Sequence, residues 1–119
     1  MPYVDGFVLP VPKKNLRAYL AMAKKASKIF KELGALEYYE CAGDDLDVKG
    51  MLSFRKMAKC KMGETVVFAW VVYQSRAHRD KANAEIMKDP RLANMMAGKS
   101  MPFDMKKMAY GGFKMMVKA

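Results

Sequence analysis

The sequence is poor in the residues that usually build metal and disulfide sites. Among its 119 residues are two cysteines and one histidine. Cys41 and Cys60 form no CxxC motif, and two thiols do not make a disulfide framework. We interpret them as reduced thiols of a cytoplasmic protein, with a bridge between them as the open alternative. No P-loop, GxGxxG, HExxH or nucleophile elbow occurs, so no metal and no cofactor are expected.

Long apolar runs are also missing. The longest, Val66 to Tyr73, is far shorter than the ~20 residues that span a bilayer. The first residues, MPYVDGFVLPVP, include Asp5 and lack the basic-then-apolar layout of a signal peptide. We therefore expect a cytoplasmic location and no membrane partner.

Acidic residues are scarce, with 12 against 22 basic ones and a formal net charge of +10. This excess raises the question of nucleic-acid binding, which should weaken steeply with salt. However, 17 of the basic residues are lysines spread along the chain, and lysine is the less specific phosphate reader. One basic ridge on the first predicted helix could be a solvated face, a phosphate contact or a membrane-surface contact; it comprises Arg17, Lys24, Lys28 and Lys31. Only nonspecific nucleic-acid attraction at low salt is expected.

Hydrophobic residues (52%) and charged residues (29%) occur in ordinary globular proportions, and the length suits one domain over residues 1–119. Periodicity predicts strands at 3–11, 35–42, 65–73 and 108–117 and helices at 13–33, 76–88 and 92–97. Gly34 ends the first helix, Ser75 caps the second, and a turn falls at Gly98. Residues 43–63 form an arm or long connection, either partly ordered with a short strand pair or docked on a partner.

The order of these elements is the βαββαβ pattern of a ferredoxin-like α+β domain with a four-stranded antiparallel sheet. The third strand, TVVFAWVVY, is apolar without alternation, which is typical of a strand buried on both faces. Two helices can cover only one face of the sheet. A second subunit packed against the other face would cover it, so we predict a homodimer.

Smaller features carry further predictions. Gly6 indicates a bulge or a close approach in the first strand, and Gly111–Gly112 a bulge or bend in the last. The inner residues of the helix at 76–88 are expected to be Ala77, Ala82, Ile86 and Met87.

Four segments together resemble the YbaA-like family of small bacterial proteins. They are YVDGFVLPVPKKNL at the start, GETVVFAWVVYQS in the third strand, RDKANAEIMKDPRL after it and MPFDMKKMAYGGF near the end. The resemblance runs from Tyr3 to about Phe113. It implies membership of the dimeric α/β-barrel group, in which two ferredoxin-like subunits pair their sheets, and it supplies no activity.

Aromatic and polar residues together suggest a binding cleft, because small ligands bind in mostly apolar clefts with a few converging polar groups. The candidate ligand-binding residues are Tyr3, Trp70, His78, Arg79, Phe103, Asp104 and Tyr110, with Asp80 and Phe113 beside them. The alternative is plain core and dimer interface, with Arg79, Asp80 and Asp104 forming salt bridges. His78 is either an exposed or capping histidine or a proton-handling group at the mouth of the cavity.

Three functions follow, in this order. The first is a homodimer that binds a small apolar or aromatic molecule in a barrel-like cleft. The second is a cofactor-free, monooxygenase-like oxidoreductase that would use Tyr110, Trp70 and His78. The third is a nonspecific nucleic-acid-binding module. The sequence assigns no catalytic residue and leaves open whether any reaction is catalysed.

Overall fold

The computed structural model describes residues 1–97 and 101–119. Its strands are β1 (Tyr3–Pro12), β2 (Glu37–Ala42), β3 (Glu64–Tyr73) and β4 (Ala109–Lys114). Its α-helices are α1 (Leu16–Glu32), α2 (Phe54–Met57), α3 (Arg76–Lys88) and α4 (Pro90–Met96), and two short 3-10 helices are η1 (Lys13–Asn15) and η2 (Met105–Lys107). The turn predicted at Gly98 lies outside the described residues.

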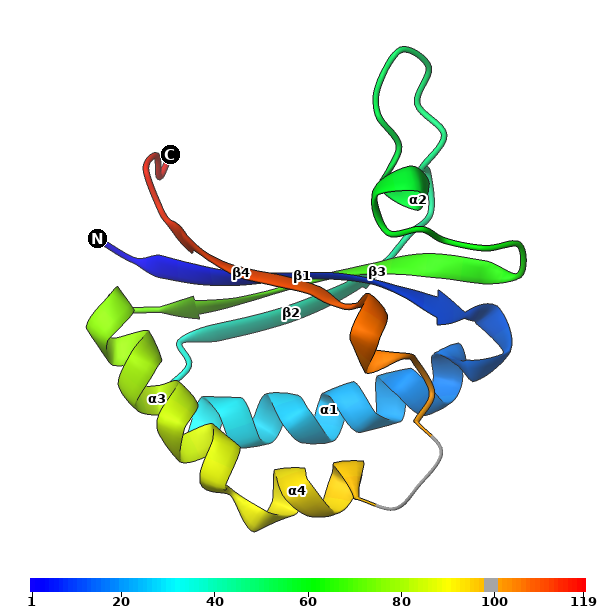
Figure 1. Cartoon of the computed structure of the whole chain (residues 1–119). Helices are drawn as coiled ribbons and strands as arrows, with labels where there is room; N and C mark the ends of the chain where they lie inside the picture. Colours follow the sequence, from blue (N-terminus) through cyan, green and yellow to red (C-terminus); the bar gives the residue numbers. More distant parts are fainter. Residues whose placement is uncertain (98–100) are drawn as a thin grey trace.

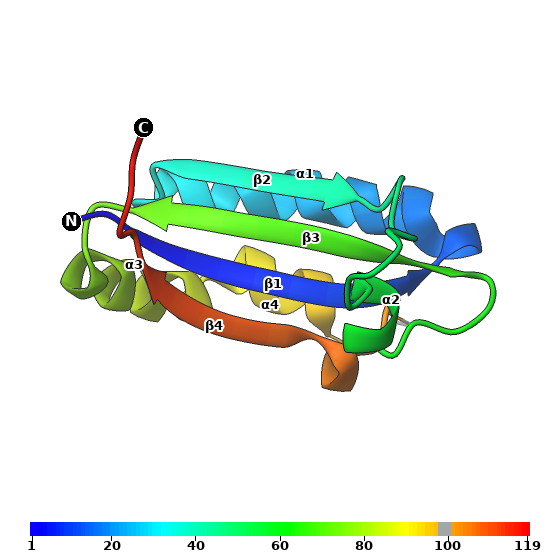
Figure 2. The same cartoon turned by 90° about the horizontal axis from the view of Figure 1, so that it is seen from above.

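The strands form one antiparallel sheet in the order β2-β3-β1-β4, with β1 and β3 at its centre. Helices α1, α3 and α4 all lie on one face of the sheet (Figure 1). The opposite face, called the open face below, carries α2 and its flanking loops at one end and the C-terminal segment after β4 at the other (Figures 1 and 2). This is the α+β arrangement that the βαββαβ order predicts.

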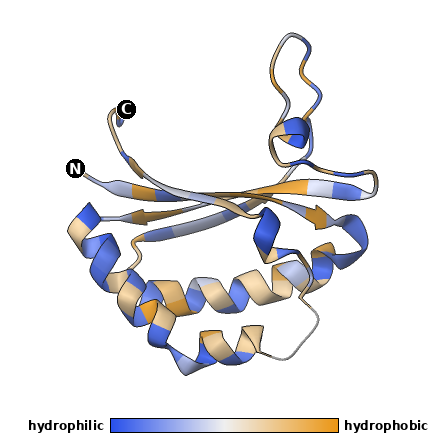
Figure 3. Ribbon diagram, in the orientation of Figure 1, coloured by the Kyte–Doolittle hydropathy of each residue, from blue (hydrophilic) through white to orange (hydrophobic). Residues whose placement is uncertain are grey.

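Strand pleating divides the sheet into two differently used faces, because successive side chains point to opposite sides. Odd-numbered residues of β1 and β3 face the helices and form the core. At one end of the sheet Leu9, Val11 and Val67 pack with Tyr19 and Phe103. At the other end Val71 and Tyr73 pack with Ala35, Ala82 and Ile86. The helices alternate hydrophilic and hydrophobic stretches along their length, as expected for helices with one face against a sheet (Figure 3).

Local signals set the ends of the helices correctly. Gly34, with φ of 126°, follows α1 in a conformation that favours glycine. The Ser75 side chain caps α3 by accepting a hydrogen bond from the His78 backbone N–H at 3.1 Å. Ala82 and Ile86, one helical turn apart, are buried as predicted, but Ala77 and Met87 are exposed. Ala77 and Met87 lie more than 90° around the helix axis from the narrow buried stripe that Ala82 and Ile86 form.

The predicted bulges are absent from the described β1–β4 pairing. Its register runs without interruption from Tyr3 opposite Lys114 to Val8 opposite Ala109. The glycines instead make room for side chains, since the Phe113 ring lies over Gly6 and Tyr3 lies against Gly112. Strand β4 is also shorter than predicted.

The connection between β2 and β3 contains the one-turn helix α2 and, within the described residues, no strand pair. Both cysteines are free thiols. No helix in the described ranges is long and apolar enough to cross a membrane.

Candidate functional site

A buried ion pair joins the sheet to α3. Asp5 is an odd-numbered residue of β1, so it faces the helices, and only 2% of its surface is exposed. Nη1 of Arg79 on α3 lies 3.3 Å from Oδ1 of Asp5. The Tyr110 hydroxyl on β4 donates to Oδ2 of Asp5 at 3.0 Å and accepts from Arg79 at 2.7 Å. We call this group the Asp5–Arg79–Tyr110 cluster.

The guanidinium of Arg79 has further partners. Its Nη2 donates to the Tyr3 hydroxyl at 3.3 Å, and the group lies 4.9 Å from the centre of the Tyr3 ring. Its Nε lies 3.0 Å from Oδ1 of Asp80. Arg79 therefore connects α3 to the central strand β1 and to the edge strand β4, because its planar guanidinium can donate to several acceptors at once.

The pKa values of both Asp5 and Arg79 are raised within the cluster. Burial raises the pKa of Asp5 above its usual range, opposed by the Tyr110 hydrogen bond and the Arg79 charge. Burial also lowers the pKa of Arg79, but Asp5 and the tyrosines outweigh that effect and raise it overall. Because Arg79 divides its charge among several acceptors, it offsets only part of the cost of burying the Asp5 carboxylate.

Tyr73 adds an unpaired polar group next to the cluster. Its side chain is fully buried, and its hydroxyl has no hydrogen-bond partner among the described residues. Burial, followed by the charge of Asp5, raises the pKa of this hydroxyl. A buried hydroxyl without a partner is costly, so such groups in native proteins call for an explanation.

The cluster reaches the surface through Tyr110, which is 49% exposed. The Tyr110 ring lies 5.0 Å from the Phe7 ring, so two aromatic faces adjoin at the β4 edge of the sheet. Gly112, opposite Asp5 in the register, leaves room for the Tyr3 side chain, which lies where a Gly112 side chain would be. The hydroxyl of Tyr110 thus links an exposed aromatic surface to a buried carboxylate.

The predicted site residues divide into separate groups. Tyr3, Arg79 and Tyr110 come together, and Asp80 pairs with Arg79. His78 lies at the start of α3, where its Nδ1 accepts from the Gln74 backbone at 3.0 Å and its ring packs on Tyr73. It is a capping histidine, one of the two roles considered for it.

Trp70, Phe103 and Asp104 lie away from the cluster. Trp70 is even-numbered and projects from the open face, where it packs on Tyr39. Phe103 belongs to the core cluster at the opposite end and packs on Tyr19 with ring centres 5.5 Å apart. Asp104 is exposed and caps η2 by accepting from the Lys106 backbone at 3.0 Å. The salt bridge considered for Asp104 is not formed among the described residues.

Sequence reasoning missed Asp5 and Tyr73 as members of the site. The signal was present, because an acidic residue inside an otherwise apolar strand, two positions after Tyr3, shares the face of that tyrosine. Tyr73 ends β3 and lies directly opposite Tyr3 in the register. Neither observation is decisive without knowing which strands are neighbours.

A second buried polar group lies under β2. The hydroxyls of Tyr19 and Tyr38 both donate to Glu40, the latter at 2.6 Å. Burial and the Glu40 charge raise the pKa of both tyrosines. Each carboxylate oxygen of Glu40 accepts one of these hydrogen bonds, so the group ties α1 to the sheet.

The open face carries an aromatic strip. Phe54 and Phe68 contact each other edge to face with centres 6.0 Å apart, and Phe68 contacts Trp70 at 5.5 Å. Tyr39 and Phe113 extend the strip across the sheet. Four of its members have 40–61% of their surface exposed: Tyr39, Phe54, Phe68 and Phe113.

Two surface hollows lie elsewhere. One of about 370 Å³ is formed by residues 47–49, residues 51–53 and Lys56, and the other, of about 250 Å³, lies beside Pro10, Met101, Phe103 and Asp104. Neither is lined by Trp70 or Tyr110. In residues 1–97 and 101–119 no three histidine, cysteine or acidic side chains gather as metal ligands.

Comparison with known proteins identifies the family. The model of the family described as "Protein of unknown function (DUF1428)" matches residues 2–105. The chain belongs to this family. The uncharacterised protein YbaA of Escherichia coli (strain K12) is 46% identical over 117 residues, which cover 98% of each chain. The resemblance to YbaA-like proteins is therefore confirmed.

Solved structures at low sequence identity share the fold of this DUF1428 member. SnoaB, a cofactor-independent oxygenase from Streptomyces nogalater, is 10% identical, with a TM-score of 0.62 over 98% of this chain and 95% of that one. A dimeric ferredoxin-like protein from an uncultured marine organism is 13% identical, with a TM-score of 0.51 over 95% and 92%. The ferredoxin-like α+β fold class is confirmed.

Proposed function

We propose that this protein is a cytoplasmic homodimer that binds a small aromatic molecule at the Asp5–Arg79–Tyr110 cluster. The two free thiols, one of them exposed, suit a reducing compartment. The proposed dimer interface and the proposed ligand site lie on different faces of the sheet, so a substitution in one leaves the other intact.

The exposed aromatic strip supports the dimer. Soluble monomers rarely leave large apolar patches uncovered, and stable interfaces bury such patches. The strip runs from β2 across β3 to Phe113 on β4, so a flat partner of the same kind would cover it. A second copy presents the same surface, and two-fold pairing makes that surface self-complementary. The fold neighbour named as dimeric adds support by analogy.

Phe68→Lys tests the dimer, because Phe68 lies within the strip and is 42% exposed. A charge buried in an apolar interface should raise the dimer dissociation constant by about 100-fold, or roughly 2.7 kcal/mol. Met87→Lys, on the outer surface of α3 with 72% exposure, is the matched control and should leave it unchanged. Sedimentation velocity across a concentration series measures both. A wild-type monomer at micromolar concentration would rule the dimer out.

The link between Tyr110 and Asp5 carries the ligand proposal. An aromatic molecule lying against Phe7 and Tyr110 would place a hydroxyl or carbonyl group beside charged partners that are already oriented. Orienting those partners in advance lowers the cost of binding. The Tyr73 hydroxyl, which has no hydrogen-bond partner in residues 1–97 and 101–119, marks the same region as one where a further polar group would be stabilised.

2-Naphthol and naphthalene serve as a pair of probes, since they differ by one hydroxyl. Equilibrium dialysis should show tighter binding of 2-naphthol, and Tyr110→Phe should remove that preference. Tyr39→Phe, at a tyrosine of similar exposure (45%) on the open face, is the control. Two results would contradict this site. One is equal binding of both probes by the wild type, and the other is an equal loss of the preference for 2-naphthol in Tyr110→Phe and Tyr39→Phe.

A cofactor-free oxygenase is the second candidate, favoured by the raised pKa of Asp5. A carboxylate with a raised pKa is a better general base, and through Tyr110 it could remove a proton from a bound quinol. The quinol would take one oxygen atom from O₂ to become a hydroxyquinone, and the second would leave as water with two hydrogen atoms of the quinol. Oxygen uptake with 1,4-dihydroxynaphthalene above the uncatalysed rate, lost in Asp5→Asn, would support this activity. Uptake unchanged by the substitution would refute it.

A further inference from the structure

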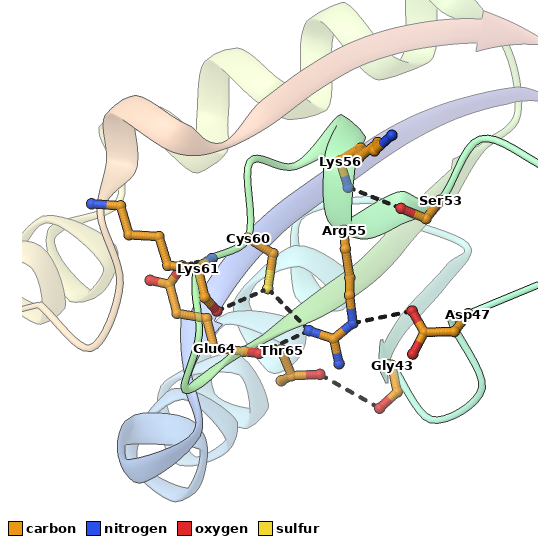
Figure 4. Close-up of polar contacts among 9 residues, drawn as sticks. All are labelled: Gly43, Asp47, Ser53, Arg55, Lys56, Cys60, Lys61, Glu64 and Thr65. Carbon is orange, nitrogen blue, oxygen red and sulfur yellow. Dashed lines mark hydrogen bonds and ion pairs between the residues drawn. The ribbon is translucent and has the colours of Figure 1, made fainter.

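The segment 43–63, called the arm below, rises from the end of the sheet where β3 begins (Figures 1 and 2). Its base is fastened to β3, because the Gly43 backbone donates to the Val66 carbonyl at 2.7 Å. Within the arm, Nε of Arg55 lies 3.7 Å from Oδ1 of Asp47, and Nη1 of Arg55 donates to the backbone carbonyl of the first residue of β3 at 3.4 Å (Figure 4). These contacts give the arm a defined shape.

The tip of the arm, residues 48–52, is a tight turn that faces open space. The Met51 backbone donates to the Val48 carbonyl at 3.4 Å, and Gly50 has a φ of 82°, as the third position of a type II turn requires. Within residues 1–97 and 101–119, no atom lies within 4 Å of the place that a Gly50 Cβ would take. Met51 and Leu52 are 73% and 72% exposed. The tip is therefore a convex apolar projection that this chain leaves in water.

Lysines surround these apolar side chains. The arm has five basic residues against three acidic ones. One acidic residue, Asp47, is paired with Arg55, and the other two, Asp44 and Asp45, directly follow the fastened base. The four lysines of the arm are exposed and form no ion pair in the part of the chain that the structure describes: Lys49, Lys56, Lys59 and Lys61. The arm thus presents free positive charge beside exposed apolar groups.

Positive and apolar groups meet in one hollow of the arm. The lining of the hollow of about 370 Å³ includes Lys49 and Lys56 together with Met51 and Leu52. Asp47 also lines it but is already in an ion pair. The Lys56 side chain extends away from the polar contacts at the centre of the arm (Figure 4). This lining suits a molecule that has an anionic group next to an aliphatic chain.

The neighbouring surface continues the pattern. The Lys13 backbone donates to the Gly63 carbonyl at 2.9 Å, so η1 lies beside the end of the arm. Lys13 and Lys14 are exposed there, and Met62 is fully exposed. The arm and η1 together form one end of the molecule that is basic and carries uncovered apolar side chains.

We propose that this end of the molecule docks on the surface of an anionic phospholipid bilayer. The tip of the arm enters the head-group region, and the surrounding lysines contact lipid phosphates. Apolar insertion combined with attraction of lysines to anionic lipids is how proteins bind such surfaces without spanning them, and the cytoplasmic leaflet carries anionic lipids. The sequence led us to expect no membrane partner because it lacks a spanning segment, but surface docking needs none. The inference goes beyond the proposed dimer and ligand site and depends on neither.

The chemistry of the arm favours a lipid surface over other anionic partners. Single-stranded nucleic acids stack their bases on aromatic side chains, but residues 48–52 include none, and Phe54 packs on Phe68 instead. Protein interfaces concentrate their binding energy in tryptophan, tyrosine and arginine, and Arg55 is engaged inside the arm. Lysine is a flexible point charge, which suits the many mobile head groups of a bilayer.

Vesicle co-sedimentation of the full chain tests the charge contribution. The protein should bind vesicles of equal parts phosphatidylcholine and phosphatidylglycerol and should not bind vesicles of phosphatidylcholine alone. Lys49→Gln with Lys56→Gln should weaken binding about 30-fold, because each lysine near an anionic surface strengthens it about 5-fold. Lys24→Gln with Lys28→Gln removes the same charge from the exposed side of α1. This matched control should weaken binding by no more than about 2-fold.

The apolar contribution is tested at the tip. Met51→Ser with Leu52→Ser should weaken binding to the anionic vesicles about 10-fold, since less apolar surface then leaves water. Met87→Ser with Met116→Ser, at side chains of similar or greater exposure outside the arm, is the control and should have little effect.

A fluorescent label gives a second readout that does not depend on affinity. In a Cys41→Ser/Cys60→Ser background, a nitrobenzoxadiazole label at Met51→Cys should shift its emission to the blue on anionic vesicles. The same label at Met87→Cys should not shift.

Three results would overturn the proposal. The first is no binding to the anionic vesicles, and the second is an equal loss of binding in the arm variants and their controls. The third is tighter binding of single-stranded poly(U) than of the vesicles, weakened by the tip substitutions, which would assign the arm to nucleic acid. All three leave the dimer and the ligand site standing, because sedimentation velocity and naphthol binding measure those separately.

Discussion

The exposed edge of the sheet and its buried interior are joined by one hydrogen bond, donated by the Tyr110 hydroxyl to Oδ2 of Asp5 at 3.0 Å. The two residues are 105 positions apart in the chain and come from neighbouring strands. Because Tyr110 is half exposed and Asp5 is buried, this hydrogen bond connects a surface side chain to a carboxylate in the interior.

Asp5→Asn should change how stability depends on pH. The folded-state pKa of Asp5 is raised, so the folded chain binds this proton more tightly than the unfolded chain does. The contribution of Asp5 to stability therefore increases as pH falls through the interval between its unfolded and folded pKa values, by at most about 1.4 kcal/mol per pH unit. Urea unfolding from pH 3 to 7 should show wild type gaining stability relative to Asp5→Asn on acidification. Parallel curves would contradict the raised pKa.

Arg79→Met should destabilise the fold by about 3–5 kcal/mol at neutral pH, because it leaves Asp5 buried without its charged partner. Arg76→Met, at an exposed position on the same helix, should change stability by less than about 0.5 kcal/mol. Combining Asp5→Asn with Arg79→Met should recover part of the loss, since the unpaired charge is then gone. If the double variant loses the sum of the two single-variant losses in unfolding free energy, the ion pair contributes nothing to stability.

Gly112→Ala should cost about 1–3 kcal/mol, because its Cβ would lie 2.7 Å from Cε2 of the buried Tyr3 ring. Gly111→Ala is the matched control, as its Cβ would meet only the Phe113 ring, at 3.8 Å. Thermal unfolding of both variants measures the difference. Equal melting temperatures would show that Tyr3 can move away without cost.

Ser75→Ala should destabilise the protein by about 1 kcal/mol through loss of the cap on α3. The effect should extend to the cluster, because Arg79 lies in the first turns of that helix. Ser27→Ala within α1, where the exposed hydroxyl donates to the Lys24 carbonyl of the same helix, should be close to neutral. Hydrogen exchange at the amides of residues 76–79 reports the loss locally, and unchanged protection there would argue against the cap.

Much of the fold was predictable because its signals are local or periodic. The cap at Ser75 and the strand formed by the unbroken apolar run of β3 each depend on neighbouring residues, and both appear as predicted. Helix α1 also forms, but Tyr19, Ala23 and Ile29 are its buried residues, and Leu20 is 44% exposed. The bulges predicted from Gly111 and Gly112 were wrong, because a glycine in a strand serves equally to admit a bulky neighbour from the next strand.

The candidate site was only partly predictable, because its residues are brought together by strand order and pleat and not by their spacing in the chain. Tyr3, Arg79 and Tyr110 were identified by type, but Trp70 was grouped with them although one step of the pleat places it on the opposite face. Asp5 was overlooked, because a single acidic residue in a strand gains its meaning from the arginine that reaches it. That arginine lies 74 positions away on a helix that crosses under the sheet.

The sequence by itself determined the order of the elements, the ends of the main helices and the membership of the DUF1428 family. These follow from spacing, capping and shared residues along the chain. Tertiary structure alone decided which aromatic residues face the helices, which face the open side, and that Asp5 is buried beside Arg79. Strand order and pleat set those relationships, since neighbours in a sheet need not be neighbours in the chain.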